Sequence, residues 1–159
     1  MDELEKAGAK GTFFLVGDNA TKYPEIVKQT LDRGHRIANH TYHHVKGWKI
    51  STEKYLSEIS ACDEVIGEQG LFRPPFGQVN FKAIAKILKD KEIIMWDVLT
   101  KDYLKIQNTK RAQKRIQRDT TAGSIAVFHD SDKAEKNLKA LLPEYLKFLK
   151  KEGYKMEVL

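Results

Sequence analysis

Residues 34–44, Gly-His-Arg-Ile-Ala-Asn-His-Thr-Tyr-His-His, form the stretch on which the interpretation of this chain depends. Gly34 ends a helical pattern, and the apolar run that follows predicts a short buried strand over residues 35–38. Three of the chain's five histidines come directly after it. His40 and His44 are four residues apart, so one helical turn would place both imidazoles on one side of the backbone, with Cβ atoms roughly 5–6 Å apart. Two neutral imidazoles at that separation favour a borderline metal ion such as zinc.

The spacing of these histidines identifies a metal site only if other potential catalytic residues are expected at the same place in the fold. Helical zinc hydrolases with a His-Glu-x-x-His motif carry a glutamate base after the first histidine. Thr41 occupies that position here, which excludes this class. The strand before the pair is informative because active sites of α/β proteins are usually built at strand ends.

Length and composition are those of an ordinary globular protein. The 159 residues are 41% hydrophobic and 31% charged, which favours a single domain over residues 1–159. The one cysteine, Cys62, excludes an intramolecular disulfide framework, and its place in a helical pattern favours a packing role. No run approaches the ~18 apolar residues of a membrane span. The charged start, Met-Asp-Glu-Leu-Glu-Lys, is not a signal peptide, so a cytoplasmic location is expected as written, with a secreted parent open if the N-terminus is truncated.

The formal net charge of +6 raises the question of an anionic partner. The lysines are scattered along expected helices, without interleaved aromatic residues or a known reader motif. This pattern is typical of a solvated face and predicts neither a nucleic-acid nor a membrane partner.

Strands and helices alternate along the whole chain with short connections. The expected strands are residues 12–16, 35–38, 71–73, 93–98, 124–129 and 154–159. The expected helices are residues 2–8, 24–33, 51–66, 80–89, 109–118 and 134–151. This alternation predicts parallel strands joined by helical crossovers, and therefore an α/β barrel or a doubly wound sheet.

Polar side chains recur at the carboxyl ends of these strands. Each has a possible structural explanation, since an arginine could pair at the surface and a histidine could be a satisfied core residue. Four such strand ends at one edge of a sheet indicate an active site instead. The residues concerned are His40 and His44, Arg73 before two prolines, Asp97 with Asp102 just beyond it, and His129.

Four ordered motifs resemble one known family. They are Thr-Phe-Phe-Leu-Val-Gly at 12–17, His-Thr-Tyr-His-His at 40–44, Arg-Pro-Pro-Phe-Gly at 73–77 and Ile-Ala-Val-Phe-His-Asp at 125–130. Their order and spacing resemble carbohydrate esterase family 4, the NodB-homology polysaccharide deacetylases, over essentially the whole chain. The resemblance implies a distorted (β/α) barrel and a divalent metal ion, usually Zn²⁺, with Co²⁺ possible. It also implies hydrolysis of an N- or O-linked acetyl group from an acetylated glycan.

The resemblance also implies a role for each matching residue. His40 and His44 correspond to the two metal-binding histidines, and Thr41 to a hydroxyl that braces the site. Arg73 corresponds to the arginine that orients the catalytic-base carboxylate. His129 corresponds to the general acid, a role that suits histidine because a free imidazole titrates near ~6.5.

Substrate contacts are expected from Pro75, Phe76 and Gly77 of the third motif and from Trp48. Trp48 and Phe76 could be sugar-stacking platforms or packed aromatic residues, and the sequence leaves both open.

Two departures from the family pattern matter. The first motif, Thr-Phe-Asp-Asp-Gly-Pro, is absent, and no Asp-Asp pair occurs in the sequence. Since that motif supplies the catalytic base and the third metal ligand, we expect a chain that lacks its first strand and deacetylates weakly or not at all. The fourth motif, Asp-x-x-Asp-Trp, falls on residues 99–103, Leu-Thr-Lys-Asp-Tyr, and retains only Asp102. Asp97 lies two residues before Leu99, on the same strand face, and is expected to tune His129 instead.

Two hypotheses follow. The chain is an esterase or amidase recorded without its first strand, or it is a non-catalytic relative that binds metal or carbohydrate. The sequence specifies neither the acetylated polymer nor the oligomeric state.

Overall fold

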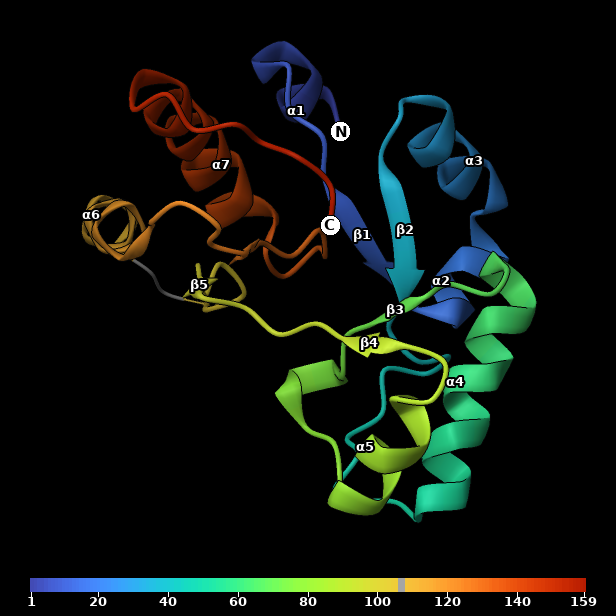
Figure 1. The fold of residues 1–159 in the computed structure, drawn as a ribbon. Helices are drawn as coiled ribbons and strands as arrows, with labels where there is room; N and C mark the ends of the chain where they lie inside the picture. Colours follow the sequence, from blue (N-terminus) through green and yellow to red (C-terminus); the bar gives the residue numbers. More distant parts are fainter. Residues whose placement is uncertain (106–107) are drawn as a thin grey trace. The chain divides into compact units, whose positions relative to one another are not determined.

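The computed structural model describes residues 1–105 and 108–159 and shows helices alternating with short parallel strands (Figure 1). The helices are α1 (Asp2–Ala7), α2 (Gly17–Lys22), α3 (Pro24–Asp32), α4 (Thr52–Ile66), α5 (Phe81–Ile87), α6 (Thr109–Asp119) and α7 (Glu135–Lys151). The strands are β1 (Thr12–Leu15), β2 (Arg36–Asn39), β3 (Leu71–Phe72), β4 (Glu92–Ile93), β5 (Val98–Leu99) and β6 (Ala126–Val127), and a 3₁₀ turn covers Pro75–Gly77.

The described residues form two compact units. The larger unit comprises Lys10–Met95 and Val158–Leu159, and it contains a parallel sheet in the order β1-β2-β3-β4. The smaller unit comprises Met1–Ala9 and Trp96–Glu157, and it contains the parallel pair β5-β6. Each unit is therefore an α/β structure with parallel strands.

Local sequence explains where the helices of the larger unit begin. Pro24 is the first residue of α3, where its missing N–H has no intrahelical partner to lose. The Ser51 hydroxyl accepts a hydrogen bond from the Lys54 N–H at 3.2 Å and caps α4. Asn80 caps α5 in the same way, through the Ala83 N–H. In Figure 1 α3 lies beside β2, which it also contacts.

Two apolar clusters hold the larger unit together. One lies between α4, β3 and α5, and its buried members are Tyr55, Ile59, Phe72, Ala83 and Ile87. The other lies between α2, β2 and α4, and its buried members are Ala20, Ile37, Cys62 and Ile66. Helix α4 takes part in both clusters, so both β2, which precedes His40, and β3, which precedes Arg73, pack against it.

The smaller unit has its own core. Val98 of β5, Ile116 of α6 and Tyr145 of α7 are buried together. The Tyr145 hydroxyl lies 2.7 Å from the Thr120 hydroxyl, which gives this buried polar group a partner. The pair β5-β6 thus has α6 and α7 to pack against.

The predicted order of elements is confirmed for the described residues, with three corrections to expected strands and one helix that was not predicted. The segment 93–98 is not one strand: β4 ends at Ile93 and β5 begins at Val98. Between them, the Ile94 and Met95 carbonyls accept hydrogen bonds from the Arg73 side chain rather than from a strand. The apolar pattern of residues 93–98 could not predict that an arginine side chain from another segment would bond to these backbone carbonyls.

The other two corrections concern β6 and the last six residues. The expected strand 124–129 is reduced to β6. Residues 154–159 are not a strand, because the Tyr154 N–H bonds to the Leu149 carbonyl and the Leu159 N–H bonds to the Thr12 hydroxyl. Helix α2 was not predicted, and it begins at Gly17, directly after the expected strand 12–16.

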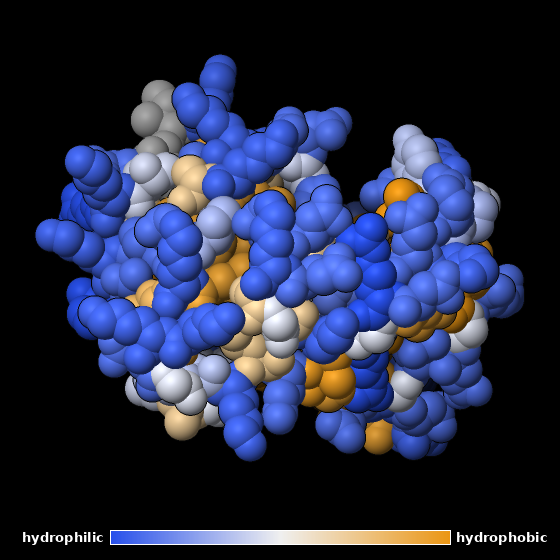
Figure 2. Space-filling model, turned by 90° about the horizontal axis from the view of Figure 1, so that it is seen from above, coloured by the Kyte–Doolittle hydropathy of each residue, from blue (hydrophilic) through white to orange (hydrophobic). Residues whose placement is uncertain are grey.

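Hydrophilic residues predominate on the face of the molecule shown in Figure 2, with hydrophobic atoms visible between them. None of the helices within 1–105 and 108–159 combines the length and the apolar composition needed to cross a membrane.

Candidate functional site

The two predicted metal histidines lie close together in the larger unit. The ring centroids of His40 and His44 are 5.0 Å apart. His40 follows β2 directly, and its Nδ1 lies 2.6 Å from the Arg73 carbonyl oxygen, just beyond the neighbouring strand β3. Since a carbonyl only accepts, this nitrogen carries the proton, and Nε2 is the nitrogen with the lone pair. The predicted meeting of these two strand ends is confirmed.

The route by which the two rings meet differs from the prediction. Residues 40–44 are not a helical turn, and Thr41 and His44 have left-handed φ values of 64° and 55°. A tight irregular turn therefore brings the imidazoles together, because each left-handed residue reverses the chain direction sharply.

Residues other than glycine with left-handed φ values occur at or beside predicted site residues in each of the two units. In the part of the chain that the structure describes, there are four: Thr41, His44, Phe76 and Lys101. Each is a predicted site residue or directly neighbours one. Such conformations cost on the order of 1–3 kcal/mol and persist only where surrounding contacts enforce them.

Arg73 is buried, and its guanidinium is held by the backbone. Its Nε donates to the Ile94 carbonyl at 3.1 Å, and its Nη2 donates to the Met95 carbonyl at 2.9 Å. The cation also lies 3.9 Å from the centre of the Phe14 ring. Burial lowers the pKa of Arg73 to about 10, so the group remains charged at neutral pH. Among the described residues no carboxylate lies within ion-pair distance of it.

The four predicted substrate residues differ in exposure. Pro75 is fully buried and Gly77 is half-buried in the 3₁₀ turn, whereas Phe76 between them is 53% exposed. The Phe76 ring lies 4.7 Å from the His44 ring. Trp48 is 69% exposed, and its Nε1 donates to the Val79 carbonyl. Phe76 and Trp48 therefore present ring surface to solvent.

Two residues that hold the histidine turn were missed by sequence reasoning. The buried Asn39 accepts the Thr41 N–H on its side-chain oxygen and donates to the Ile59 carbonyl. The buried Glu58 of α4 accepts hydrogen bonds from His43. The sequence did contain a signal for Glu58: it falls among the apolar positions of α4, where a buried charge needs a hydrogen-bonding partner.

In the smaller unit, Asp102 and His129 form a hydrogen-bonded pair. Asp102 is fully buried, and its two oxygens accept from the His129 Nδ1 and the His129 backbone N–H, each at 2.7 Å. Because Nδ1 is hydrogen-bonded to Asp102, Nε2 is the remaining ring nitrogen, and the His129 side chain is 38% exposed. The Tyr103 ring contacts the His129 ring edge-on, at 5.0 Å. Asp102 follows β5 and His129 follows β6, so this second pair of strand ends meets as predicted.

The expected pairing of Asp97 with His129 is wrong, and Asp102 has that place. Asp97 is exposed, and its carboxylate accepts the Ile125 N–H at 2.8 Å. The segment that contains Asp97 is a bend and not a strand, so the alternation that placed it on a shared face does not apply.

Further contacts hold the segment that carries Asp102. The buried Asn137 of α7 donates to the Asp102 and Leu104 carbonyls at 2.6 and 2.8 Å. Arg115 of α6 donates to the Leu99 and Thr100 carbonyls. Side chains of α6 and α7 thus hold the backbone of residues 99–104 in place.

The residues present fit a divalent metal ion in part. His40, with its proton on Nδ1, and the adjacent His44 supply the imidazole nitrogens that zinc and similar ions prefer. No group of three or more His, Cys, Asp or Glu side chains within residues 1–105 and 108–159 is placed to hold a metal. His40 and His44 are therefore the side chains to test for metal binding.

Comparison with known proteins relates the chain to a described family. A family model described as "Polysaccharide deacetylase" matches residues 1–94. The peptidoglycan-N-acetylglucosamine deacetylase PgdA of Listeria monocytogenes is 32% identical over 97% of this chain, which spans 33% of that relative's length.

Solved structures agree with this match. The peptidoglycan deacetylase PdaC from Bacillus subtilis has a TM-score of 0.86 at 26% identity, over 99% of this chain and 78% of that one. A CE4 family pseudoenzyme from Bacillus anthracis has a TM-score of 0.87 at 25% identity, over 99% of this chain and 57% of that one. The fold is thus the α/β, barrel-type fold of these deacetylases. The chain belongs to the polysaccharide deacetylase family.

Proposed function

We propose that this chain takes part in the metal-dependent hydrolysis of acetyl groups from an acetylated polysaccharide or oligosaccharide. The observation that carries the proposal is the His40–His44 pair, with ring centroids 5.0 Å apart and the His40 proton held on Nδ1 by the Arg73 carbonyl. Family membership and similarity to proteins named as peptidoglycan deacetylases support it. Peptidoglycan is accordingly the substrate to test first.

His40 and His44 would hold the metal ion, with Zn²⁺ proposed first and Co²⁺ as an alternative. A bound divalent ion supplies Lewis acidity, which polarises the acetyl carbonyl and makes the attacking water more acidic.

His129 is proposed as the general acid. Water loses a proton to the carboxylate base as it adds to the acetyl carbonyl carbon. The carbon–nitrogen or carbon–oxygen bond then breaks, and the leaving atom takes the proton from Nε2 of the doubly protonated His129 ring. Asp102 keeps the other ring nitrogen protonated and aims the ring throughout. Arg73 is proposed to orient a carboxylate base, because its buried guanidinium donates to two carbonyls through Nε and Nη2 and has further N–H groups that can donate to an anion.

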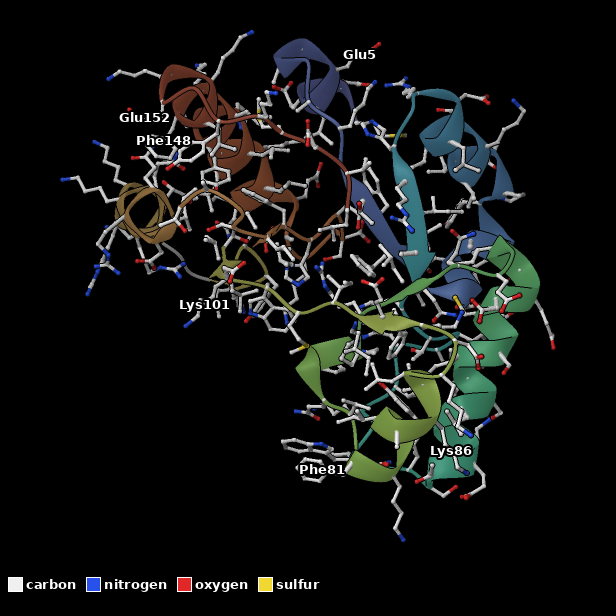
Figure 3. All side chains as sticks on the ribbon, viewed as in Figure 1. Glu5, Phe81, Lys86, Lys101, Phe148 and Glu152 are labelled. Carbon is white, nitrogen blue, oxygen red and sulfur yellow. The ribbon has the colours of Figure 1, made fainter. Side chains whose placement is uncertain are left out.

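Exposed rings are proposed to bind the sugar chain. Phe76 and Trp48 are both exposed, and the Phe76 ring lies 4.7 Å from the His44 ring. Lys46 lies over the Phe76 ring at 4.7 Å. Phe81 is 90% exposed and projects away from the start of α5 (Figure 3). Aromatic rings of this kind cover the apolar faces of sugars, while their amphipathic surroundings keep them hydrated.

The metal-binding test uses the double variant His40→Ala/His44→Ala. The unchanged chain should bind Zn²⁺ or Co²⁺ at a ratio of about one to one, and the double variant should lose that binding. His129→Ala is the matched control, because it removes a histidine from the other unit and should leave metal content unchanged. Elemental analysis after dialysis measures all three. Metal retained at equal ratio by the double variant would exclude the site.

A second candidate function is binding without hydrolysis. It is favoured by the lack of a carboxylate near Arg73 in the described residues and by the similarity to a CE4 family pseudoenzyme. Acetate release from an N-acetylated sugar oligomer, with metal in excess, separates the two. Metal-dependent release that the histidine double variant abolishes supports hydrolysis, whereas oligomer binding without release supports the second function.

A further inference from the structure

Glu58 is a buried carboxylate on the apolar face of α4. It is 3% exposed and lies between Tyr55 and Ile59, which both belong to a buried apolar cluster. A carboxylate in such surroundings is costly unless several donors meet it.

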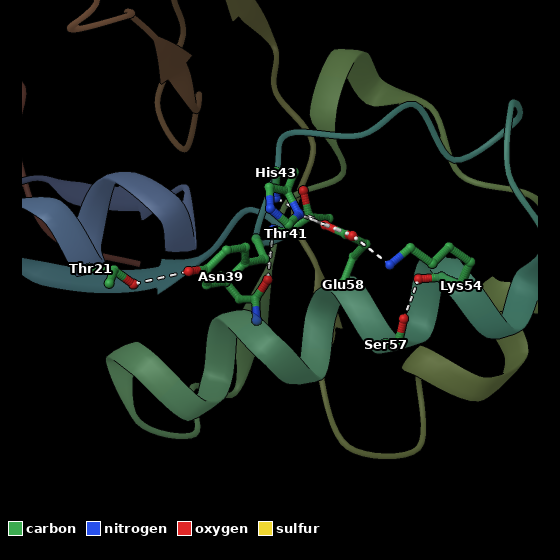
Figure 4. Close-up of polar contacts among 8 residues, drawn as sticks. Thr21, Asn39, Thr41, His43, Lys54, Ser57 and Glu58 are labelled. Carbon is green, nitrogen blue, oxygen red and sulfur yellow. Dashed lines mark hydrogen bonds and ion pairs between the residues drawn. The ribbon is translucent and has the colours of Figure 1, made fainter.

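The donors that meet Glu58 come chiefly from the histidine turn. The His43 N–H donates to one Glu58 oxygen at 3.0 Å, and the protonated His43 Nδ1 lies 3.1 and 3.2 Å from the two oxygens (Figure 4). The Glu58 backbone carbonyl also accepts the Tyr42 N–H, at 2.9 Å. One residue of α4 therefore holds two consecutive residues between His40 and His44.

A lysine from the same helix completes the environment of the carboxylate. Lys54 lies 3.2 Å from Glu58, but its side chain is 62% exposed, so this ion pair contributes little by itself. Burial alone raises the pKa of Glu58, yet the hydrogen bonds from His43 and Lys54 outweigh it and hold that pKa below its ordinary value. Glu58 is therefore an anion at neutral pH and accepts on both oxygens.

The turn requires such an anchor because its backbone is strained. Thr41 and His44 both have left-handed φ values, and a β-branched residue such as Thr41 adopts one only under constraint. Asn39 secures the first half of the turn through the Thr41 N–H. Glu58 secures the second half, on the side of His44.

We propose that Glu58 is a positioning residue that holds the His40–His44 turn in the conformation in which both imidazoles are presented to one metal ion. This inference rests on the metal-binding role proposed above. Residues that orient metal ligands from behind typically change metal affinity about 10–100-fold when removed.

The experiment measures Co²⁺ binding to the 159-residue chain by titration and by the visible absorption of the bound ion. Glu58→Ala should weaken Co²⁺ binding about 10–100-fold and alter the absorption bands, since the two ligands lose their fixed geometry. Glu58→Gln should weaken it less, because the amide oxygen still accepts the His43 N–H. Glu64→Ala and Glu64→Gln change an exposed glutamate of the same helix and should bind as the unchanged chain does.

Far-UV circular dichroism identifies the variants that fold, and only those are compared. If Glu58→Ala does not fold, the Co²⁺ affinity and absorption of Glu58→Gln are compared with those of Glu64→Gln, and this comparison tests the inference. The inference would be overturned if the folded Glu58 variants had the same Co²⁺ affinity and absorption spectra as the Glu64 variants. The proposed metal site would not be affected by that result. Absence of Co²⁺ binding in the unchanged chain would overturn the proposed function and this inference with it.

Discussion

Two buried carboxylates hold a histidine in the same way. Asp102 accepts both the backbone N–H and the ring Nδ1 of His129, and Glu58 does the same for His43. Two acceptor oxygens on one rigid group fix both the main chain and the ring tautomer, which a single hydrogen bond does not. At the scale of single residues, burial of the carboxylate keeps water from competing for these bonds.

His129→Ala should lower turnover of a metal-loaded, active preparation by about 10²–10⁴, the usual contribution of a positioned general acid. Asp102→Asn should cause a loss of similar order, because an amide that donates to Nδ1 favours the wrong tautomer. Acetate release at saturating substrate measures both effects, with metal content checked for each variant.

Asp97→Asn serves as the discriminating variant for this pair. Asp97 accepts the Ile125 N–H and does not contact His129, so turnover should change little. A loss with Asp97→Asn and none with Asp102→Asn would assign the tuning role to Asp97 after all.

At the scale of elements, two loops of the larger unit lie in very close contact. The Trp48 indole donates to the Val79 carbonyl, and the Asn80 side chain donates to the Gly47 carbonyl. A Cβ atom at Gly47 would lie 2.5 Å from the Gln78 carbonyl oxygen. Glycine is needed here for space, since its φ is not left-handed. This contact holds the segment after the histidine turn against the segment after Arg73.

Gly47→Ala should therefore destabilise the fold by about 1–3 kcal/mol, as other overpacked substitutions do. Chemical denaturation measured by circular dichroism gives the change in the free energy of unfolding. Gly70→Ala is the matched control, because nothing lies within 4 Å of its added methyl group and its φ is also not left-handed. Equal free energies of unfolding for the two variants would show that the two loops can move apart without loss of stability.

At the scale of the whole molecule, each compact unit has an apolar core, and hydrophilic residues predominate on the face shown in Figure 2. Cys62 belongs to the core of the larger unit, and its thiol donates to the Leu15 carbonyl. Burial raises the pKa of Cys62 to about 11, so the thiol stays neutral at pH 8. The predicted packing role of this residue is consistent with its complete burial.

Cys62 should accordingly react with a thiol reagent such as dithionitrobenzoate only when the larger unit opens. At pH 8 the folded protein should show negligible labelling, and protein unfolded in denaturant should react with a ratio of one to one. Absorbance of the released thiolate follows the reaction. Complete labelling within seconds in the absence of denaturant would show that the core around α4 is open.

The α/β class and the strand ends that carry His40, Arg73, Asp102 and His129 were predictable from the sequence. So was the order of helices and strands, apart from α2, the division of 93–98 into β4 and β5, and the last six residues. These features depend on local causes: hydrophobic periodicity, glycine and proline at element ends, and short motifs of fixed spacing. Where a local rule failed, another segment had competed for the backbone, as the Arg73 side chain does for the carbonyls after β4.

The tertiary structure alone decided which polar residues work together. Asp102 rather than Asp97 pairs with His129, a residue 27 positions away, and Glu58 reaches back 15 positions to His43. Sequence spacing does not predict such pairs, because burial and hydrogen-bond geometry between distant segments determine them. The strained turn at His40–His44 is likewise a tertiary result, since left-handed φ values at threonine and histidine persist only through contacts supplied by α4 and Asn39.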